Sequence, residues 1–405
     1  MRILLITQLF DPENAIKGLS FVKALVQMGY EVEVLTTFPS YPGGKIYAGF
    51  NQKLRHVEYH NGIKVVRLPS YISHNSSILK RMLNYGSFGF CCLIHGLFFS
   101  ARPSLIYAYH PAIVAGMVAW IIGAVKRTPF VYDVQDLWPD ALTDSGTLNV
   151  GRISKSIGKI ADFIYRQSAH VIVLSDGYRK ILMGRGVPGD KVTRIYNWCD
   201  ESRVTPGFEV TQSNRLDANR FNILYAGNFG AAQGLAHVLD AAKIVQQTSP
   251  HIQFILMGDG IEAQILKEKA RKEQLNNVIF LPRLPIDQVG QLARQADALL
   301  IHLKSSPVYE VTIPSKTQFS LALGKPILMA TSGEAENLVR NAFAGVFSNS
   351  CDAANIASAA IELSNKSAKE LGAMGENASC FYHKHLSMAC GVAALDAVIS
   401  HIGER

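Results

Sequence analysis

The sequence predicts an α/β fold of two domains, each built on a parallel sheet with helices on both faces. The first observation is the apolar run MRILLIT at 1–7, which leads into a polar loop and a helix. The second is FNILYAGNFG at 221–230, which repeats this opening near the midpoint of the 405 residues. A buried strand that leads through a loop into a helix is the first unit of a doubly wound sheet. Two such openings therefore indicate two Rossmann-like domains, which we expect to face one cleft.

The first half of the chain alternates between expected strands and helices. Strands are expected at 2–7, 31–36, 104–109, 130–134, 170–175 and 192–197, with shorter strands through 65–66. Helices are expected at about 16–28, 112–125, 153–167 and 176–183. Short apolar runs separated by segments of helical period are what a parallel sheet with crossover helices requires.

The segment 201–220 is polar, contains Pro and Gly and has no periodicity, so we interpret it as a linker. Beyond it, strands are expected near 221–226, 252–257, 278–281, 297–302, 326–330 and 345–348, and helical stretches at about 352–364 and 367–402. We therefore assign 1–200 to an N-terminal domain and 221–385 to a C-terminal domain. Residues 386–405 are expected to form a terminal helix that crosses back toward the first domain.

The positive charge of the chain is confined to its first half. Residues 1–200 hold 22 Lys and Arg against 13 Asp and Glu, a net of +9, whereas residues 201–405 hold 18 against 19. The first domain is therefore expected to meet an anionic surface or ligand. No compact basic run and no interleaving of aromatic and basic residues is present, which argues against a nucleic-acid partner.

The six cysteines form no C-x-x-C pair and are typical of reduced cytoplasmic thiols. Cys380, His383, His385 and Cys390 could hold a metal ion, but packed or solvated positions on terminal helices are the favoured interpretation. The N-terminal apolar run is short, is interrupted by charge at 11–13, and lacks a small-residue cleavage signature. We expect it to be a strand and not a signal peptide.

An uncharged segment of twenty residues at 82–101 follows Lys80 and Arg81. Its length would permit a membrane span, but Asn84, His95 and scattered Gly and Ser dilute it. We expect a helix of the first domain that dips into the membrane interface, with Lys80 and Arg81 on anionic headgroups. A fully buried core helix is the alternative.

Most unusual residue clusters follow an expected strand. They lie at 11–14 with Gly18, 38–45, 110–111 and 136–140 in the first domain, and at 227–230, 258–260, 282–283, 310–316 and 332–334 in the second. In open α/β sheets ligands bind outside the carboxyl ends of the strands. These clusters are therefore expected to line the walls of the cleft.

The choice of ligand is narrowed by the glycine motifs. A G-x-G-x-x-G at 184–189 follows a helical segment and contains Pro188, so it is not a dinucleotide motif, and no P-loop sequence occurs. Glycine-rich turns precede helices at 227–234 and, with Pro314 in the first turn, at 313–316. Two helix N-termini and Lys316 would suit a diphosphate without a metal. Alternatively, Pro314 and Ser315 only start a helix whose Lys316 is solvated.

The two predicted domains and several short motifs resemble those of a known family. Two such domains, with YNWCD at 196–200 and ALGKP at 322–326, resemble the GT-B glycosyltransferases of family 4. The motifs FPSYP (38–42), DLWPD (136–140), YAGNFG (225–230) and IPSK (313–316) are similar to markers of the WbuB-like group. That group is associated with transfer of N-acetyl-L-fucosamine or related aminosugars in bacterial O-antigen and capsule assembly. The similarity spans essentially the whole chain.

The resemblance implies a retaining hexosyltransferase that moves a sugar from UDP to an acceptor hydroxyl. The donor would lie against the C-terminal domain and the acceptor against the N-terminal one. It implies donor contacts at Gly18, Gly227, Asn228, Gly230, Gln233, Arg283, Leu284, Pro314 and Ser315. Gly18 would approach the diphosphate, and Arg283 and Leu284 would flank the uracil through their backbone. His110 would lie beside the reacting sugar and Glu310 would meet the sugar of the donor.

The sequence departs from the broad family at two places. The Arg and Lys that neutralise the diphosphate are replaced by the uncharged Asn228 and Gln233. The second carboxylate of the family's E-x7-E pair, counted from Glu310, is Gln318, or Phe319 in the alternative alignment. The WbuB-like group shares the neutral pattern, so we interpret it as a different mode of donor binding, in which Lys316 has a larger part in binding the diphosphate.

The mechanism is expected to follow from charge. Breaking the anomeric bond leaves an extra negative charge on UDP, which helix N-termini and Lys316 would stabilise. No DxD triplet occurs, so we predict that no metal and no cofactor is needed. The catalytic candidates are His110, Glu310 and Lys316, and a packed, satisfied His110 is the alternative. The expected acceptor-facing residues are Tyr41, Lys45, Asp136 and Asp140, the last three with a loop or helix-cap role as the alternative.

A lipid-diphosphate acceptor at the inner face of the bacterial plasma membrane would explain both the basic first domain and the segment 82–101. We therefore expect a cytoplasmic, peripheral protein whose partners are a UDP-sugar, a lipid-diphosphate-linked saccharide and an anionic membrane surface. The alternatives are a UDP-sugar 2-epimerase of the same architecture and a catalytically silent partner of a polysaccharide-assembly complex.

Overall fold

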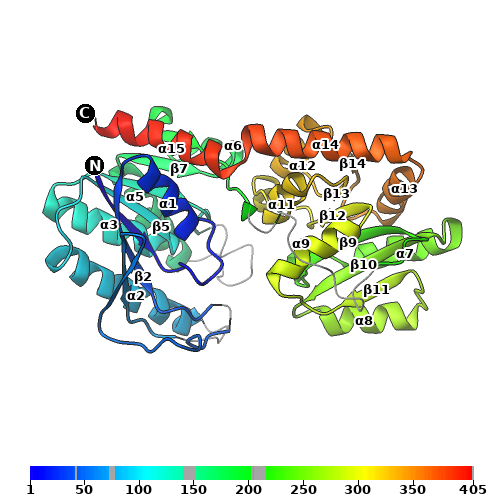
Figure 1. The fold of residues 1–405 in the computed structure, drawn as a ribbon, viewed down its shortest axis with the longest axis horizontal. Helices are drawn as coiled ribbons and strands as arrows, with labels where there is room; N and C mark the ends of the chain where they lie inside the picture. The colour runs from blue at the N-terminus through cyan, green and yellow to red at the C-terminus, as the bar shows by residue number, and fades with distance from the viewer. Residues whose placement is uncertain (42, 73–77, 140–151, 202–203, 205–215, 404–405) are drawn as a thin grey trace. The chain divides into compact units, whose positions relative to one another are not determined.

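The chain forms two compact units, each an α/β domain on a mostly parallel sheet, as the two sequence openings predict (Figure 1). The computed structural model describes all residues except 42, 73–77, 140–151, 202–203, 205–215 and 404–405. Unit 1 comprises Met1–Tyr196 and Gly391–Arg405, and unit 2 comprises Asn197–Cys390. Most of the predicted linker at 201–220 lies outside the described residues.

Unit 1 contains an eight-stranded sheet of order β3-β4-β2-β1-β5-β6-β7-β8. Its strands are β1 (Arg2–Thr7), β2 (Glu31–Thr37), β3 (His56–His60), β4 (Ile63–Leu68), β5 (Leu105–His110), β6 (Phe130–Val134), β7 (His170–Val173) and β8 (Val192–Arg194). Its helices are α1 (Leu19–Gln27), α2 (Ile78–Phe98), α3 (Ala112–Lys126), α5 (Arg152–Gln167), α6 (Asp176–Gly184), the 3₁₀ turn η1 (Gly189–Lys191) and α15 (Met388–Gly403).

The expected short strands through 65–66 form a hairpin. β3 runs antiparallel to β4, and the turn between them is Asn61-Gly62, with φ of 50° and 85°. Two consecutive residues with positive φ give the two-residue turn that fits the twist of a hairpin, and Asn-Gly is its preferred sequence. The described pairings of the other strands in this sheet are parallel, and their inner residues are nearly all buried.

The order of the strands fixes which helices share a face of the sheet. The connection from β1 to β2 through α1 runs one way along the sheet, whereas α2, α3 and α5 connect strands in the other direction. Because parallel crossovers are right-handed, α1 lies on one face and α2 and α3 lie on the other (Figure 1). A crossover helix runs antiparallel to its strands, so α2 starts at the carboxyl edge of the sheet.

Unit 2 contains a six-stranded parallel sheet of order β11-β10-β9-β12-β13-β14. Its strands are β9 (Phe221–Asn228), β10 (Ile252–Asp259), β11 (Val278–Leu281), β12 (Ala298–His302), β13 (Ile327–Ala330) and β14 (Gly345–Phe347). Its helices are η4 (Ala231–Gln233), α7 (Ala236–Thr248), α8 (Ala263–Lys272), α9 (Ile286–Gln295), α10 (Pro307–Glu310), α11 (Ser315–Leu323), α12 (Glu334–Asn341), α13 (Ala353–Ser364) and α14 (Ala368–His385).

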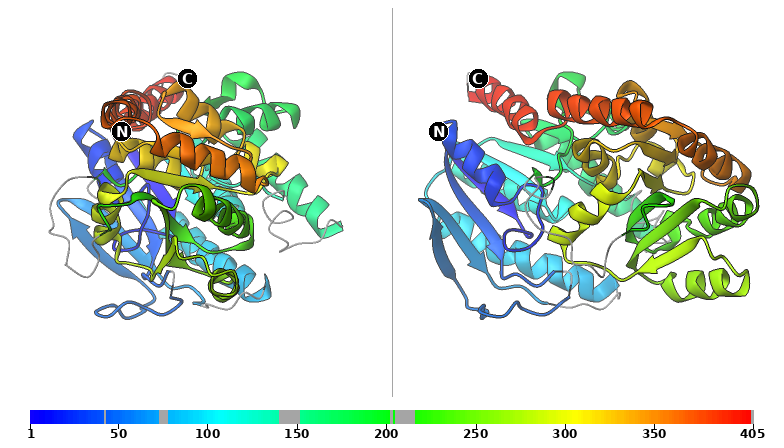
Figure 2. Two further views of the ribbon diagram at one scale, coloured as in Figure 1. Left: turned by 90° about the vertical axis from the view of Figure 1, so that its right-hand side faces the viewer. Right: turned by 45° about the vertical axis from the view of Figure 1, so that its right-hand side comes forward.

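Alternate residues of β9 pack into the two hydrophobic cores of unit 2, one on each face of the sheet. Ile223 and Tyr225 pack with α7 and α13 on one face, and Leu224 packs with α9 and α11 on the other. A parallel strand covered by helices on both faces must be apolar throughout, which explains why FNILYA is not amphipathic. The side views in Figure 2 show helices over both faces of each sheet.

The helical stretch expected at 367–402 divides into α14 and α15. The Ser387 hydroxyl accepts the N–H of Cys390 at 3.3 Å, which caps the start of α15, and the capping box of Ser367 and Glu370 starts α14. By length and composition the described stretch Ala368–Gly403 could cross a membrane. Tyr382, Leu386, Leu395 and Ile399 are buried, as is typical of helices that pack on a core.

Candidate functional site

The predicted clusters of the first domain follow four adjacent strands of unit 1. The order β2-β1-β5-β6 brings the loops after these strands to one carboxyl edge, where they carry residues 11–18, 38–45, 110–111 and 135–139. The predicted acceptor residue Asp140 lies outside the described residues. The remaining predicted site residues of this domain are therefore collected on one edge of one sheet.

Gly18 is the residue that precedes α1, and its lack of a side chain is required. A Cβ at this position would overlap the carboxylate of Asp11, whose Oδ2 accepts the N–H of Leu19 at 2.6 Å. Asp11 thus caps the start of α1, where a negative charge is favourable. The structure explains the glycine by this cap, and contact of Gly18 with a diphosphate stays a prediction.

The loop that carries Tyr41 and Lys45 is held by Glu13. This carboxylate is 4% exposed, and its Oε1 accepts the N–H groups of Ser40 and Tyr41, each at 2.7 Å. Burial raises the pKa of Glu13 against the opposing effect of these bonds. Tyr41 and Lys45 are exposed. Glu13 therefore fixes the backbone from which two predicted acceptor residues project.

His110 ends β5, and its ring is held within the edge. Its carbonyl accepts the N–H of Gln8 at 2.8 Å, and the Tyr85 ring meets it edge-on at 6.3 Å. Nδ1 of His110 is buried and has no hydrogen-bond partner among the described residues. Burial lowers the pKa of His110 to about 4, so its imidazole is neutral at pH 7. A neutral ring with an unused nitrogen is suited to hydrogen-bond a ligand.

The first turns of α2 extend this edge. Asn84 Oδ1 accepts a hydrogen bond from Gln8 Nε2 at 2.7 Å. Burial raises the pKa of Tyr85, the positive charge of Arg81 lowers it, and Asp136 raises it further. Asp136 reaches solvent, although desolvation raises the pKa of its carboxyl. Arg81 and Asp136 therefore each lie within electrostatic range of Tyr85, whose ring contacts His110, a grouping that the sequence did not indicate.

In unit 2, the two predicted glycine-rich turns meet at Lys316. Its Nζ donates to the Tyr225 hydroxyl at 2.6 Å and lies 3.9 Å from the Tyr225 ring centroid. A Cβ on Gly227 would overlap the Lys316 side chain, so only glycine permits this approach. The prediction that the turns at 227 and 313 lie together is confirmed.

Lys316 combines a cation with a helix N-terminus. Pro314 directly precedes α11 and Lys316 is its second residue, and the first N–H groups of a helix have no acceptor within it. Burial lowers the pKa of Lys316 to about 7. Lys316 is partly exposed and bonded to Tyr225, and the arrangement is suited to an anion.

The neutral residues that replace the family's Arg and Lys bond to each other. Gln233 Oε1 accepts the Gly230 N–H at 3.2 Å and lies 3.4 Å from Asn228 Nδ2. The Tyr225 hydroxyl donates to the Asn228 carbonyl at 2.7 Å. Asn228 and Gln233 thus shape the turn after β9, and their predicted contact with the donor stays untested.

The other predicted donor residues lie on the same carboxyl edge. Arg283 is exposed and Leu284 half-buried in the loop after β11, two strands from β9. Glu310 is exposed at the end of α10, with its Oε1 at 3.5 Å from the hydroxyls of Ser305 and Ser332. Gln318, which stands at the second position of the family's E-x7-E pair, is buried within α11 and 3% exposed. Its amide gives Glu310 no carboxylate partner at that position.

Sequence reasoning missed Tyr225 and His302 in this unit. His302 ends β12, and its Nδ1 lies 2.6 Å from the Gln233 carbonyl oxygen. Burial lowers the pKa of His302 to about 4, against the opposing effect of its hydrogen bonds with the Gln233 and Ser350 backbone. A polar residue that closes an apolar strand, as in ALLIH, is the signal that could have found it.

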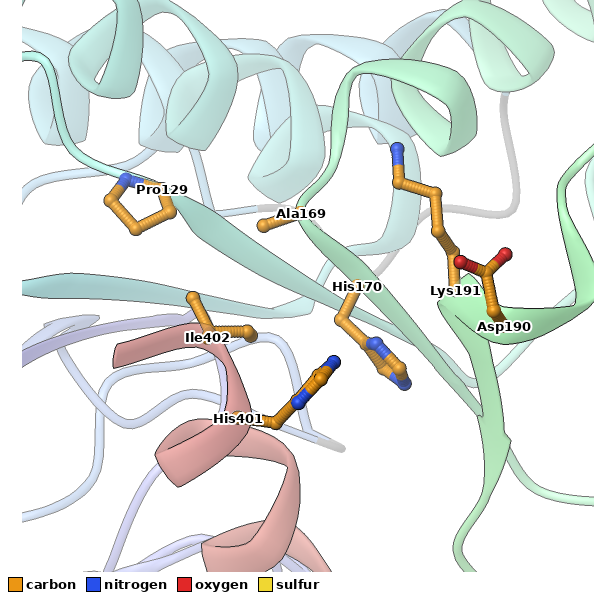
Figure 3. Close-up of a pocket in the computed structure, with 7 residues that line it drawn as sticks. All are labelled: Pro129, Ala169, His170, Asp190, Lys191, His401 and Ile402. Atoms are coloured by element: carbon orange, nitrogen blue, oxygen red, sulfur yellow. The ribbon is translucent and has the colours of Figure 1, made fainter. Parts of the chain in front are cut away.

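A separate cavity lies at the opposite, amino edge of the sheet in unit 1 (Figure 3). It measures about 290 Å³, and its lining residues are Pro129, Ala169, His170, Asp190, Lys191, His401 and Ile402. None of the predicted site residues lines it. Within the described ranges, no three His, Cys, Asp or Glu side chains are grouped so that they could hold a metal ion.

Comparison with known families matches each half of the chain. Residues 19–198 match the glycosyl transferase 4-like domain, and residues 208–380 match the glycosyl transferases group 1 domain. The chain is 27% identical over 314 residues to WcaI of Escherichia coli (strain K12), a candidate glycosyl transferase of colanic acid biosynthesis, covering 75% of this chain and 76% of that protein. It is 26% identical to the candidate glycosyltransferase WbjE of Pseudomonas aeruginosa over 50% of this chain and 51% of that one.

Solved structures share the fold over the full length. Anabaena HepE in complex with UDP-glucose aligns with a TM-score of 0.68 at 17% identity, over 99% of this chain and 100% of that one. Sucrose-phosphate synthase from Thermosynechococcus elongatus aligns with a TM-score of 0.70 at 15% identity, over 99% and 98%. At these identities the likeness establishes the fold alone and does not identify the substrates.

Proposed function

The chain belongs to the GT-B glycosyltransferases of family 4, and we propose that it is a retaining enzyme of bacterial surface polysaccharide assembly. In this proposal it moves an N-acetylated aminosugar, of the N-acetyl-L-fucosamine type, from a UDP-sugar to a lipid-linked saccharide, without a metal ion or cofactor. Its relation to WcaI, whose name refers to colanic acid biosynthesis, supports the polysaccharide role, and the sequence motifs support the aminosugar.

The observation that carries the proposal is the arrangement of Lys316, Tyr225 and Gly227. It provides one cation and the N–H groups of a helix start at a place where glycine lets the chain come close. A leaving diphosphate gains negative charge in the transition state, and preorganised donors stabilise it there. The complex of HepE with UDP-glucose shows that this fold can bind such a donor.

The acceptor is proposed to lie on the carboxyl edge of unit 1. The neutral imidazole of His110 would hydrogen-bond at the reacting centre, with Tyr41, Lys45 and Asp136 around the saccharide. The β-phosphate oxygen that leaves would take the proton of the acceptor hydroxyl on the same face, which gives retention.

A peripheral place on the inner face of the plasma membrane is supported by α2. Its inner face holds the buried Phe88 and His95, whereas an apolar stripe is exposed on the outer face, with residues spaced three, four or seven apart along the helix. The stripe comprises Leu79, Met82, Leu83, Phe90, Ile94 and Phe98. A core helix needs no such second face, so we propose that α2 enters the headgroup region, with Lys80 and Arg81 on anionic headgroups.

A transfer assay tests the proposal. UDP-aminosugars labelled in the sugar are mixed with the full chain and vesicles that contain lipid-diphosphate-linked saccharides. Label that moves to the organic-extractable lipid supports the proposed transferase, and the anomeric configuration of that product tests retention. An interconverted sugar nucleotide would instead indicate an epimerase, and absence of UDP release with every donor and acceptor would indicate a silent partner.

A further inference from the structure

Unit 1 contains a buried ion pair beneath its predicted site. The side chain of Lys17 is 2% exposed and that of Asp133 is fully buried, and Lys17 Nζ contacts Asp133 Oδ2. The Tyr107 hydroxyl donates to the same oxygen, and Gln135 Nε2 donates to Oδ1 at 2.6 Å. Asp133 is the one charged residue in the otherwise apolar strand FVYDV.

This cluster joins the loop after β1 to β5 and β6, the next two strands of the sheet. Lys17 lies in the loop after β1, Tyr107 on β5 and Asp133 on β6, in the sheet order β1-β5-β6. The ammonium lies 5.7 Å and 5.1 Å from the ring centroids of Tyr107 and Tyr109, so the lysine side chain passes over β5 on its way to β6.

Each segment of the cluster lies within three residues of a predicted site residue. Lys17 is followed by Gly18, Tyr109 by His110, and Gln135 by Asp136. Any movement of the ion pair therefore shifts the start of α1, the imidazole and the acceptor loop together. We propose that Lys17, through Asp133, is a positioning residue for the transfer reaction. The pair fixes the positions of these three site elements relative to one another.

A contribution to stability alone does not explain why a buried ion pair occupies this place. Desolvating two charges offsets most of their attraction, and well-packed apolar residues of similar volume are often as stabilising. A charged contact that is also hydrogen-bonded differs from apolar packing in that it fixes direction and distance. Misplacement of reacting groups by about 1 Å is enough to lower a rate about a hundredfold.

The inference rests on the proposed transfer function and is tested with the full chain by the radiolabel assay. Lys17→Met is expected to lower the melting temperature, because it leaves a buried carboxylate unpaired. The double variant Lys17→Met with Asp133→Leu is expected to recover part of that loss, since no charge is then left unpaired, although Tyr107 and Gln135 each lose an acceptor. Its kcat is nevertheless expected to stay at least about tenfold below wild type, because the site elements are no longer held in their relative positions.

A double variant with both the melting temperature and the kcat of wild type would overturn the inference, since the pair would then be structural only. Tyr107→Phe covers the case in which the double variant does not fold. It keeps the ring and the ion pair but removes one donor to Asp133, so kcat is expected to fall severalfold while the melting temperature falls by less than in Lys17→Met. An unchanged kcat in Tyr107→Phe would also overturn the inference.

Lys64→Met is the matched control. Lys64 pairs with Glu33 at 2.9 Å between β4 and β2, with side chains 28% and 9% exposed, toward the amino end of β2. This variant is expected to lower stability and leave kcat unchanged. If wild type transfers no sugar at all, the proposed function fails. If wild type transfers and the stable double variant equals it, only the positioning role fails.

Discussion

Replacing Lys316 with methionine is expected to weaken UDP binding about 10- to 150-fold at pH 7. Methionine keeps most of the side-chain volume beside Gly227 but removes the ammonium that contacts the Tyr225 hydroxyl. A hydrogen bond to a charged group contributes about 1.5–3 kcal/mol, which converts to this range of affinity.

The same lysine predicts how UDP affinity depends on pH. Burial lowers the pKa of Lys316 to about 7 in the free protein, and a bound diphosphate, being of opposite charge, raises it. Affinity is therefore complete below pH 7 and falls as the pH rises through that value, because binding then requires proton uptake. Between pH 7.5 and 9 the loss is expected to be about 20-fold, if the pKa in the complex returns near that of an ordinary lysine.

Isothermal titration calorimetry with UDP, in buffers of different ionisation enthalpy, measures both the affinity and the proton uptake. Lys316→Arg is expected to abolish the pH dependence, because arginine stays charged throughout. Lys325→Met is the matched control, since Lys325 is a half-buried lysine at the amino end of β13 whose pKa is also lowered by burial. It should leave UDP affinity unchanged. Affinity in Lys316→Met equal to wild type, or no proton uptake by wild type at pH 8, would refute the reasoning.

The melting temperature of Lys316→Met distinguishes the expected loss of UDP affinity from misfolding of the variant. The folded pKa of Lys316 lies below its unfolded value, so between about pH 7 and 10 the unfolded chain binds more protons, and the buried lysine opposes folding. Methionine removes that penalty. The ligand-free variant is therefore expected to melt no lower than wild type at pH 7.5, as calorimetry can show.

Three further predictions concern unit 1. Glu13→Ala removes the acceptor of the Ser40 and Tyr41 N–H groups, so the KM for the acceptor should rise while the Kd for UDP stays constant, and an unchanged KM would exclude a role for this loop. His110→Ala should lower kcat about a hundredfold, and because the pKa of His110 is about 4, the pH profile of wild-type kcat should show no histidine step between pH 6 and 8. Phe90→Ser combined with Phe98→Ser should weaken binding to vesicles of anionic lipid in flotation assays, whereas Ile261→Ser, at an 84% exposed position of unit 2, should not, and equal binding by both variants would contradict membrane contact through α2.

The sequence predicts the fold and the edges of the site well, because both depend on local patterns. The openings at 1–7 and 221–230 identify the first strand of each sheet, and polar clusters after strands mark the carboxyl edges. Lys316 could be predicted because Pro314 and Ser315 mark a helix start, where a cation and free N–H groups coincide.

The contacts that hold the site could not be predicted in this way. Lys17 and Asp133 are 116 residues apart, and no local pattern pairs them, although an aspartate inside FVYDV signals a buried charge in need of a partner. Glu13 similarly bonds to the backbone of another loop, which leaves no trace in side-chain identity. At the break between α14 and α15, the Ser387 hydroxyl accepts the Cys390 N–H and the distant Glu201 carboxylate accepts the Met388 N–H, and the second contact leaves no local pattern.

A crystal structure of the full chain with UDP tests the central claim most directly. We expect the β-phosphate within hydrogen-bonding distance of Lys316 Nζ and of the N–H groups at the start of α11, with the turn at 227–230 alongside. A diphosphate seated elsewhere, with Lys316 still bonded only to the Tyr225 hydroxyl, would contradict the account.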